Sequence, residues 1–264
     1  MPETSYLLLC DETNKEPSEK GRFFIYGGLF VPISAIKPLN EIVEEIRLKY
    51  GYRPGDLFKF SPKTKPEQVT PESFRLAKQD VLDRCSQLGL ACVFSLTHHE
   101  VAKNRPVDEL IGWGANTVFG AFNEYLSGRK ATGIAITDRL PFVKEFDFLR
   151  SKFQIGLSFP NGRTKRLSNI LIFASSCEGA SNLLSVNDIM LGAFRYCINE
   201  RDKTIAPREI MGRLIKLIWR FEGNGKIYLN EFGLRFRPKE VVLDAYRKEY
   251  QDIEEHLKAL IEET

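Results

Sequence analysis

The sequence predicts an α/β protein built on a mixed sheet of five strands, with helices on both faces. Short apolar runs, rich in aromatic and β-branched residues, indicate strands that are buried on both faces of a sheet. Longer segments with apolar residues at helical spacing separate most of these runs, which is typical of strands that alternate with helices. The chain has 264 residues, 43% of them apolar, and is therefore long enough to bury such a core.

Five runs are predicted as strands. They are Tyr6–Cys10, Phe23–Val31, Ala91–Thr97, Gly133–Thr137 and Asn169–Ala174. Residues 11–22, between the first two, contain the Asn, Pro, Ser and Gly that mark a turn. A hairpin rather than a helical crossover therefore joins these two strands, and the sheet is expected to be mixed.

Helices are predicted in the longer segments. Three of them cover Ile36–Tyr50, Pro71–Leu88 and Pro106–Leu126, and Gly51, Gly89 and Gly128 are expected to stop them. A fourth helix begins at Pro141, with apolar residues at helical intervals (Phe142, Phe146, Leu149 and Phe153). A fifth carries an apolar stripe formed by Leu183, Val186, Met190, Phe194 and Cys197.

The pattern changes after Asn199, so we expect an α/β domain over residues 1–200 and a carboxy-terminal appendage over residues 201–264. The appendage is predicted as a helix, a hairpin and a second helix. The first helix spans Pro207–Trp219, and the hairpin covers Lys226–Phe236 after a turn at residues 223–225. The long charged helix begins near Pro238, with Val242, Tyr246, Ile253, Leu257 and Leu260 on one side. This last helix is a candidate for homodimer formation.

Composition excludes several classes of protein. The longest apolar runs are far shorter than the roughly 20 residues that cross a bilayer, so no membrane association is expected. The amino terminus carries no secretory signal pattern. The five cysteines form no C-x-x-C pair, which favours a reducing cytoplasm over a disulfide framework or a structural zinc site. The net charge of +3 neither requires nor excludes nucleic acid.

Two predicted strands run directly into an aspartate. Asp11 follows the first strand and Asp138 follows the fourth. Ligands bind at the carboxyl ends of strands in α/β sheets, because the loops diverge there and leave a crevice. Local roles are the alternative, and for either residue alone they are favoured: an Asx turn for Asp11 and a helix cap for Asp138.

A third acid, Asp188, lies early in the fifth predicted helix and off its apolar stripe. Gly192 is one turn further on, where its missing side chain leaves space above the carboxylate. A favourable interaction with the helix dipole is the alternative role of Asp188. Together the three aspartates form a plausible site for Mg²⁺ or Mn²⁺, which prefer oxygen ligands. Two such ions can hold the attacking and leaving oxygens of a phosphodiester.

Several motifs, in matching order over Tyr6–Asn199, resemble the family catalogued as domain of unknown function 3800. They are YLLLCDET (6–13), FFIYGGLFV (23–31), LFKFS (57–61), ITD (136–138) and LSVNDIMLG (184–192). The resemblance implies a ribonuclease H-like fold and a metal-dependent nuclease activity, with Asp11, Asp138 and Asp188 at the family's acidic positions. The chain departs from the family pattern at Thr13, where serine is usual, and at Ser185 and Asn187, where glutamine and alanine are usual.

Supporting residues are Lys59 and Glu12. Lys59 lies between two phenylalanines and either reaches a phosphate or is an ordinary surface lysine. Glu12 points away from Asp11 on an extended backbone and joins the site only if the strand has already ended. Two short basic loops are candidate phosphate contacts, but such loops are more often simply solvated (Lys63 and Lys65; Arg163, Lys165 and Arg166). His98 and His99 are predicted as surface residues.

Two functions follow from these patterns. The first is a divalent-metal-dependent nuclease that hydrolyses phosphodiester bonds in RNA or DNA, with Asp11, Asp138 and Asp188 as ligands. The second is a non-catalytic module on the same fold that binds nucleic acid or protein.

Overall fold

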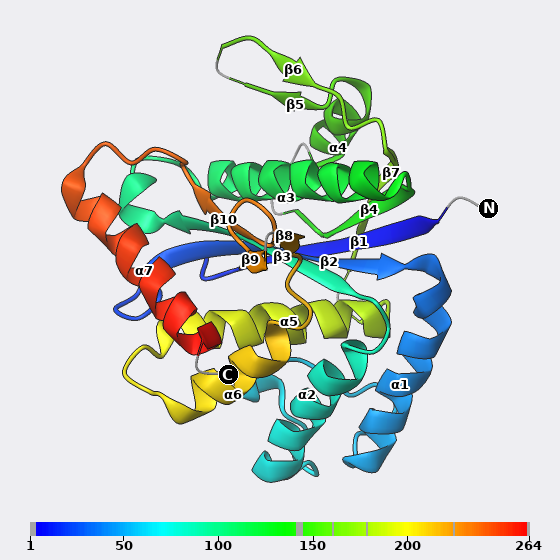
Figure 1. Ribbon diagram of the computed structural model, residues 1–264. Coiled ribbons are helices and arrows are strands. Elements are labelled where there is room, and N and C mark those ends of the chain that lie inside the picture. The colour runs from blue at the N-terminus through cyan, green and yellow to red at the C-terminus, as the bar shows by residue number, and fades with distance from the viewer. Residues whose placement is uncertain (1–3, 141–144, 160, 178, 224, 263–264) are drawn as a thin grey trace.

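A six-stranded mixed sheet forms the centre of the protein (Figure 1). The computed structural model describes residues 4–140, 145–159, 161–177, 179–223 and 225–262. The sheet has the strand order β10-β3-β2-β1-β4-β7. Its strands are β1 (Ser5–Thr13), β2 (Phe23–Pro32), β3 (Ala91–His98), β4 (Thr132–Asp138), β7 (Ile170–Ser176) and β10 (Leu234–Arg237).

Strand β2 runs opposite to the other five strands of this sheet. It pairs antiparallel with β1 on one side and with β3 on the other. The remaining pairs, β1 with β4, β4 with β7 and β3 with β10, are parallel. The hairpin predicted between the first two strands is thereby confirmed, and so is the mixed α/β sheet. The β1, β4 and β7 strands all end at the same edge of the sheet.

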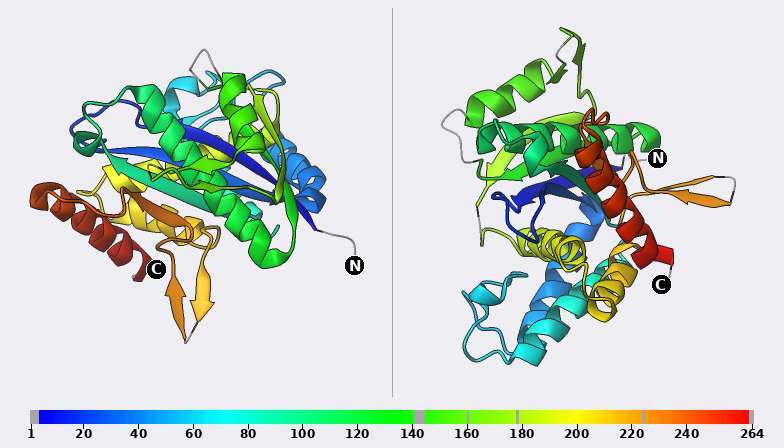
Figure 2. Two further views of the ribbon diagram at one scale, coloured as in Figure 1. Left: turned by 90° about the horizontal axis from the view of Figure 1, so that it is seen from above. Right: turned by 90° about the vertical axis from the view of Figure 1, so that its left-hand side faces the viewer.

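Helices cover both faces of the sheet, and each face has its own apolar core (Figures 1 and 2). One face is covered by α3 (Val107–Arg129), with α4 (Glu145–Gln154) beside it. The other carries α1 (Ile36–Lys49), α2 (Pro71–Cys85), α5 (Asn182–Asn199), α6 (Ile205–Leu214) and α7 (Asp244–Glu262). Short 3₁₀ turns occupy Ile33–Ala35, Pro62–Thr64 and His99–Val101.

Helix ends follow the predicted stops at two of three positions. Gly51 and Gly89 have positive φ angles of 83° and 68° shortly after α1 and α2, a conformation that glycine adopts without strain. Gly128 instead lies inside α3, and Lys130 takes the left-handed conformation that ends this helix. The predicted start of a helix at Pro141, with Phe142, lies outside the described residues. From Glu145 onwards the predicted helix is present as α4.

The carboxy-terminal segment is tied into the same core as the rest of the chain. The hairpin predicted over Lys226–Phe236 is wrong: β9 (Lys226–Tyr228) pairs with β8 (Phe221–Gly223), and β10 pairs with β3 in the central sheet. The sheet therefore has one strand more than the five predicted. In Figure 2 the β8–β9 hairpin projects from the body. A second small hairpin joins β5 (Leu157–Ser158) to β6 (Thr164–Lys165).

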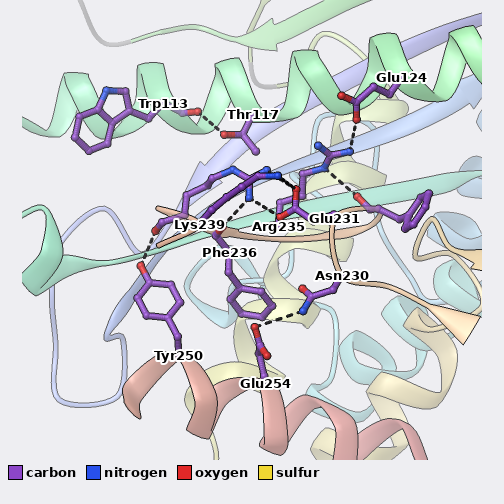
Figure 3. Close-up of polar contacts among 12 residues, drawn as sticks. Trp113, Thr117, Glu124, Asn230, Glu231, Arg235, Phe236, Lys239, Tyr250 and Glu254 are labelled. Carbon is purple, nitrogen blue, oxygen red and sulfur yellow. Dashed lines mark hydrogen bonds and ion pairs between the residues drawn. The ribbon is translucent and has the colours of Figure 1, made fainter. Parts of the chain in front are cut away.

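Polar contacts hold β10 and α7 in place (Figure 3). Arg235 of β10 donates a hydrogen bond to Glu124 of α3 at 2.7 Å. The Tyr250 hydroxyl of α7 accepts the His98 backbone N–H at 2.8 Å and donates to the Arg237 carbonyl. Apolar residues of α6, β10 and α7 join the core that α1, α2 and α5 cover. The domain boundary at residue 200 stays a prediction, but the segment after it packs as part of this core.

The apolar side of α7 faces its own chain. Of the residues predicted to share one side of this helix, Ile253, Leu257 and Leu260 are buried, whereas Val242 precedes the helix and is 87% exposed. A homodimer through this helix stays a prediction. Among the described residues, no helix combines the length and the apolar character that a membrane crossing requires.

Candidate functional site

The side chains of Asp11 and Asp138 lie next to each other on the same face of the sheet. Because side chains alternate along a strand, Leu9 and Asp11 face α5, while Leu8 and Cys10 face α3. The same alternation along β4 turns Asp138 toward α5. Cys10 is paired with Thr137 at the end of the parallel β1–β4 ladder, so the two aspartates that follow lie side by side just beyond it.

Helix α5 brings Asp188 to this face. The Ser181 side chain caps the helix by accepting the Leu183 backbone N–H at 3.1 Å. The predicted apolar stripe is buried throughout and fixes the helix against β1 and β2 (Leu183, Val186, Met190, Phe194 and Cys197). With the stripe turned into the core, the adjacent face of the helix carries Asp188 toward the strand ends.

The three aspartates line one cleft with a volume of about 390 Å³. Its walls come from the end of α1, the loop over residues 52–59 and the start of α5. Lys59, Arg47 and Arg53 also line it, so basic side chains share the cleft with the three acids. The sequence-based expectation that Asp11, Asp138 and Asp188 share a crevice agrees with this arrangement.

Each of the three carboxylates accepts a backbone N–H. Asp11 accepts that of Glu12 at 2.7 Å, Asp138 that of Arg139 at 2.9 Å, and Asp188 that of Phe60 at 2.7 Å. The local roles considered for Asp11 and Asp138 do not account for their positions. Strand β1 continues to Thr13, and residues 139 and 140 are not helical, so Asp138 caps no helix that starts at residue 139.

Electrostatics within the cleft disfavour three bare negative charges. Burial raises the pKa of the Asp11 carboxyl, and the negative charges of Glu12, Asp138 and Asp188 raise this pKa further. The Glu12 N–H lowers it, but by less than these combined effects. A cation beside Asp11 would relieve the repulsion.

Glu12 lies on the other side of β1, as the alternation along a strand predicts. Its side chain is 4% exposed and forms an ion pair with Lys15, with 2.5 Å between Oε1 and Nζ. It is not among the residues that line the cleft. Of the five candidate site residues, the structure therefore brings together Asp11, Asp138, Asp188 and Lys59. Glu12 acts on Asp11 through its backbone N–H and through the charge of its side chain, which lies outside the cleft.

The segment around Lys59 is held against α5 by Phe60. A Cβ on Gly192 would lie 2.3 Å from the Cβ of Phe60, so only glycine allows this approach. The sequence predicts open space above Asp188 at Gly192, and this is wrong in one respect. The space exists, but Phe60 fills it and places its backbone N–H on Asp188.

Sequence reasoning missed Lys78, which lies in α2 behind this segment. Its ammonium group donates to the Phe60 carbonyl at 3.2 Å and lies 4.3 Å and 4.0 Å from the ring centres of Phe60 and Phe74. Burial lowers the pKa of Lys78 to about 8, against the opposing effect of the Asp188 charge. One feature of the sequence could have indicated the contact between Lys78 and Phe74. The two residues are four positions apart, and residues at this spacing share one face of a helix.

Arg47 is a second residue that the sequence did not single out. Its guanidinium donates to the carbonyls of Arg53 and Asp56 at 3.2 Å and 2.9 Å. These bonds hold the loop that forms one wall of the cleft. Arg47 therefore shapes the wall, whereas Arg53 adds an exposed positive charge at its rim.

Two lysines of the predicted basic loops bond to other groups of the chain. Lys65 donates to two carbonyls of its own loop, and Lys165 pairs with Glu124. His98 and His99 are 5% and 7% exposed, so their prediction as surface residues is wrong. His98 packs among aromatic rings of β2 and α7, and this packing explains its burial.

The chemical type of the ligand groups in the cleft suits a hard divalent cation. These groups are carboxylates without His or Cys, which suits Mg²⁺ or Mn²⁺ better than zinc. Within the described ranges, no three or more His, Cys, Asp or Glu side chains gather closely enough to hold a metal ion as they stand. The aspartates thus share a cleft without forming a closed cluster.

Comparison with known proteins gives no assignment: no protein-family model matches the chain, and no curated protein matches it.

Proposed function

We propose that this protein is a divalent-metal-dependent nuclease that hydrolyses phosphodiester bonds in RNA or DNA. The observation that carries the proposal is that Asp11, Asp138 and Asp188, which are far apart in the chain, line one cleft. Burial, and after it the negative charges of neighbouring acids, raise the pKa of Asp11, which supports a site that a cation would stabilise. Mg²⁺ or Mn²⁺ is the expected cofactor.

The strand order supports the ribonuclease H-like fold that is predicted for residues 1–200. Strands β3, β2, β1, β4 and β7 are consecutive in the sheet, and β2 is antiparallel to its neighbours. The acids stand on the first and fourth strands and on a late helix, the places that the sequence resemblance implies for such proteins. In this proposal the resemblance to the family of unknown function 3800 reflects a shared fold and site.

The residues of the cleft have different roles in the proposed hydrolysis. Asp11, Asp138 and Asp188 would hold the metal ions through their carboxylate oxygens. A bound divalent ion lowers the pKa of an attacking water and stabilises charge on the phosphoryl oxygens. Lys59 and Arg53 place positive charge along the same cleft, where it attracts the phosphates of a nucleic-acid strand.

The proposal is tested by a cleavage assay on labelled single- and double-stranded RNA and DNA. The protein is incubated with Mg²⁺, with Mn²⁺ or with EDTA, beside the variant Asp188→Asn. A matched control is Asp252→Asn, which makes the same change at an exposed position of α7. We expect cleavage that EDTA and Asp188→Asn abolish and that Asp252→Asn leaves unchanged.

Two outcomes would contradict the proposal. Cleavage that persists in EDTA or in Asp188→Asn would exclude the cleft as the source of activity. Binding of nucleic acid without cleavage in any metal would favour the non-catalytic module. A homodimer and a cytoplasmic location remain predictions of the sequence.

A further inference from the structure

The backbone N–H and the backbone carbonyl of Phe60 are each hydrogen-bonded to a charged side chain. Its N–H donates to Oδ2 of Asp188 at 2.7 Å, and its carbonyl accepts from Nζ of Lys78 at 3.2 Å. Lys78 and Asp188 belong to different helices, α2 and α5. Phe60 therefore links the two helices through its backbone, and we call this set of contacts the Lys78–Phe60–Asp188 chain.

Lys78 is held tightly enough to act as a fixed anchor. Its ammonium group lies against the ring faces of Phe60 and Phe74, at 4.3 Å and 4.0 Å from their centres. Phe74 is one turn earlier in α2 and is itself 5% exposed. Lys78 does not line the cleft, so it cannot serve as a phosphate contact there. Its hydrogen bond and one of its two ring contacts are made with Phe60, and the other ring contact is made with Phe74 of its own helix.

The other end of the chain is fixed by α5. Gly192 lies one turn after Asp188, and Phe60 packs directly over it, in a position that any Cβ would block. The same residue, Phe60, thus touches the helix that bears Asp188 through both its ring and its N–H. A shift of the Phe60 backbone would withdraw a hydrogen bond from the carboxylate.

We propose that Lys78 is a positioning residue for the acidic site: by holding the Phe60 carbonyl, it keeps the Phe60 N–H on Asp188 and fixes the orientation of that carboxylate in the cleft. This inference rests on the proposed function, because it assigns Asp188 to metal binding. Hydrogen bonds behind the ligands orient them, and their loss typically lowers metal affinity by about 10–100-fold.

The test compares three variants with the unaltered protein. Lys78→Met keeps the length and the apolar stem but removes the charge and the donors. Lys78→Arg restores a cationic donor. Lys248→Met is the matched control, because Lys248 is an exposed lysine inside another helix, α7. If Lys78→Met does not fold, Lys78→Gln takes its place, since glutamine is neutral and shorter.

Two readouts are measured. The first is Mn²⁺ affinity by electron paramagnetic resonance, where Lys78→Met should bind about 10–100-fold more weakly. Lys78→Arg should recover part of the loss, and Lys248→Met should stay within about twofold. The second is hydrogen exchange of the Phe60 amide in metal-free protein. This exchange should accelerate at least about tenfold in Lys78→Met, while core amides of β2 keep their protection.

The outcomes separate this inference from the proposed function. If the unaltered protein does not bind Mn²⁺, the proposed function fails. If it binds Mn²⁺ and Lys78→Met binds equally well, only the positioning role of Lys78 is overturned. Unchanged exchange of the Phe60 amide in Lys78→Met would also overturn it, whatever the metal does.

Discussion

Replacing Gly192 by alanine is expected to destabilise the protein, although alanine is the better helix former. Gly192 lies inside α5, and an added Cβ would lie 2.3 Å, 2.4 Å and 2.7 Å from the Cβ, Cγ and Cδ1 of Phe60. Carbon atoms pack at about 3.5–4.0 Å, so Phe60 would have to move by about 1 Å. The clash involves the start of the side chain, which a rotation of the ring cannot relieve.

Three contributions decide the sign of the effect. Alanine in place of glycine favours a helix interior by about 0.8–1.0 kcal/mol. Overpacking of a filled site costs about 1–3 kcal/mol. Displacing Phe60 also weakens its hydrogen bond to the Asp188 carboxylate, and bonds to charged groups contribute about 1.5–3 kcal/mol. We therefore expect the free energy of unfolding of Gly192→Ala to fall by about 1–4 kcal/mol.

The assay is urea unfolding followed by circular dichroism, with Gly112→Ala as the matched control. Gly112 lies inside α3, and an added Cβ there would meet only an ordinary contact, 3.8 Å from Cε2 of Phe148. This control should be unchanged or more stable by about 0.5–1 kcal/mol. If Gly192→Ala proves as stable as the control, Phe60 does not pack over α5 and the reasoning is refuted.

Three further predictions concern the acidic site and the docking of α7. Asp11→Asn removes a carboxyl whose pKa is raised by burial and by neighbouring negative charges, so its Tm in EDTA should exceed that of the unaltered protein; an equal or lower Tm would argue against repulsion in the cleft. Tyr250→Phe removes the hydroxyl that joins the His98 N–H to the Arg237 carbonyl, and urea titration should show a loss of about 1–3 kcal/mol. Burial lowers the pKa of His98, against the opposing charge of Glu249, so the unfolded state takes up a proton first as the pH falls. The contribution of His98 to stability should therefore decline as the pH drops below about 6.5 through the pKa of the folded protein. The Tm difference between the unaltered protein and His98→Gln should change between pH 7 and 5 in the direction of this loss, and a constant difference would contradict the reasoning.

The sequence predicted the elements whose signal is local. Each of the five strand runs is present in the sheet, because burial on both faces leaves a continuous apolar run that can be read directly. The shared cleft of Asp11 and Asp138 was predictable from a second local signal. Both residues directly follow an apolar run of a parallel strand, and the carboxyl ends of such strands meet at one edge of a sheet.

The features that were missed depend on packing between distant segments. Strand β10 has only four residues, and its partner β3 lies far earlier in the chain, so no local pattern predicts the pairing. The contact of Lys78 with Phe60 depends on how α2 lies against the segment before it. The burial of His98 likewise depends on how α7 packs over β3, since Tyr246 and Tyr250 of this helix both contact the histidine ring.

The most direct test of the acidic site is a crystal structure of the protein soaked in Mn²⁺, with an anomalous difference map. Metal binding by the three aspartates predicts a peak within coordination distance of carboxylate oxygens from Asp11 and Asp138, and of Asp188 directly or through water. The peak should disappear in crystals of Asp11→Asn. A map without a peak in the cleft, or with Mn²⁺ bound only elsewhere, would contradict the account.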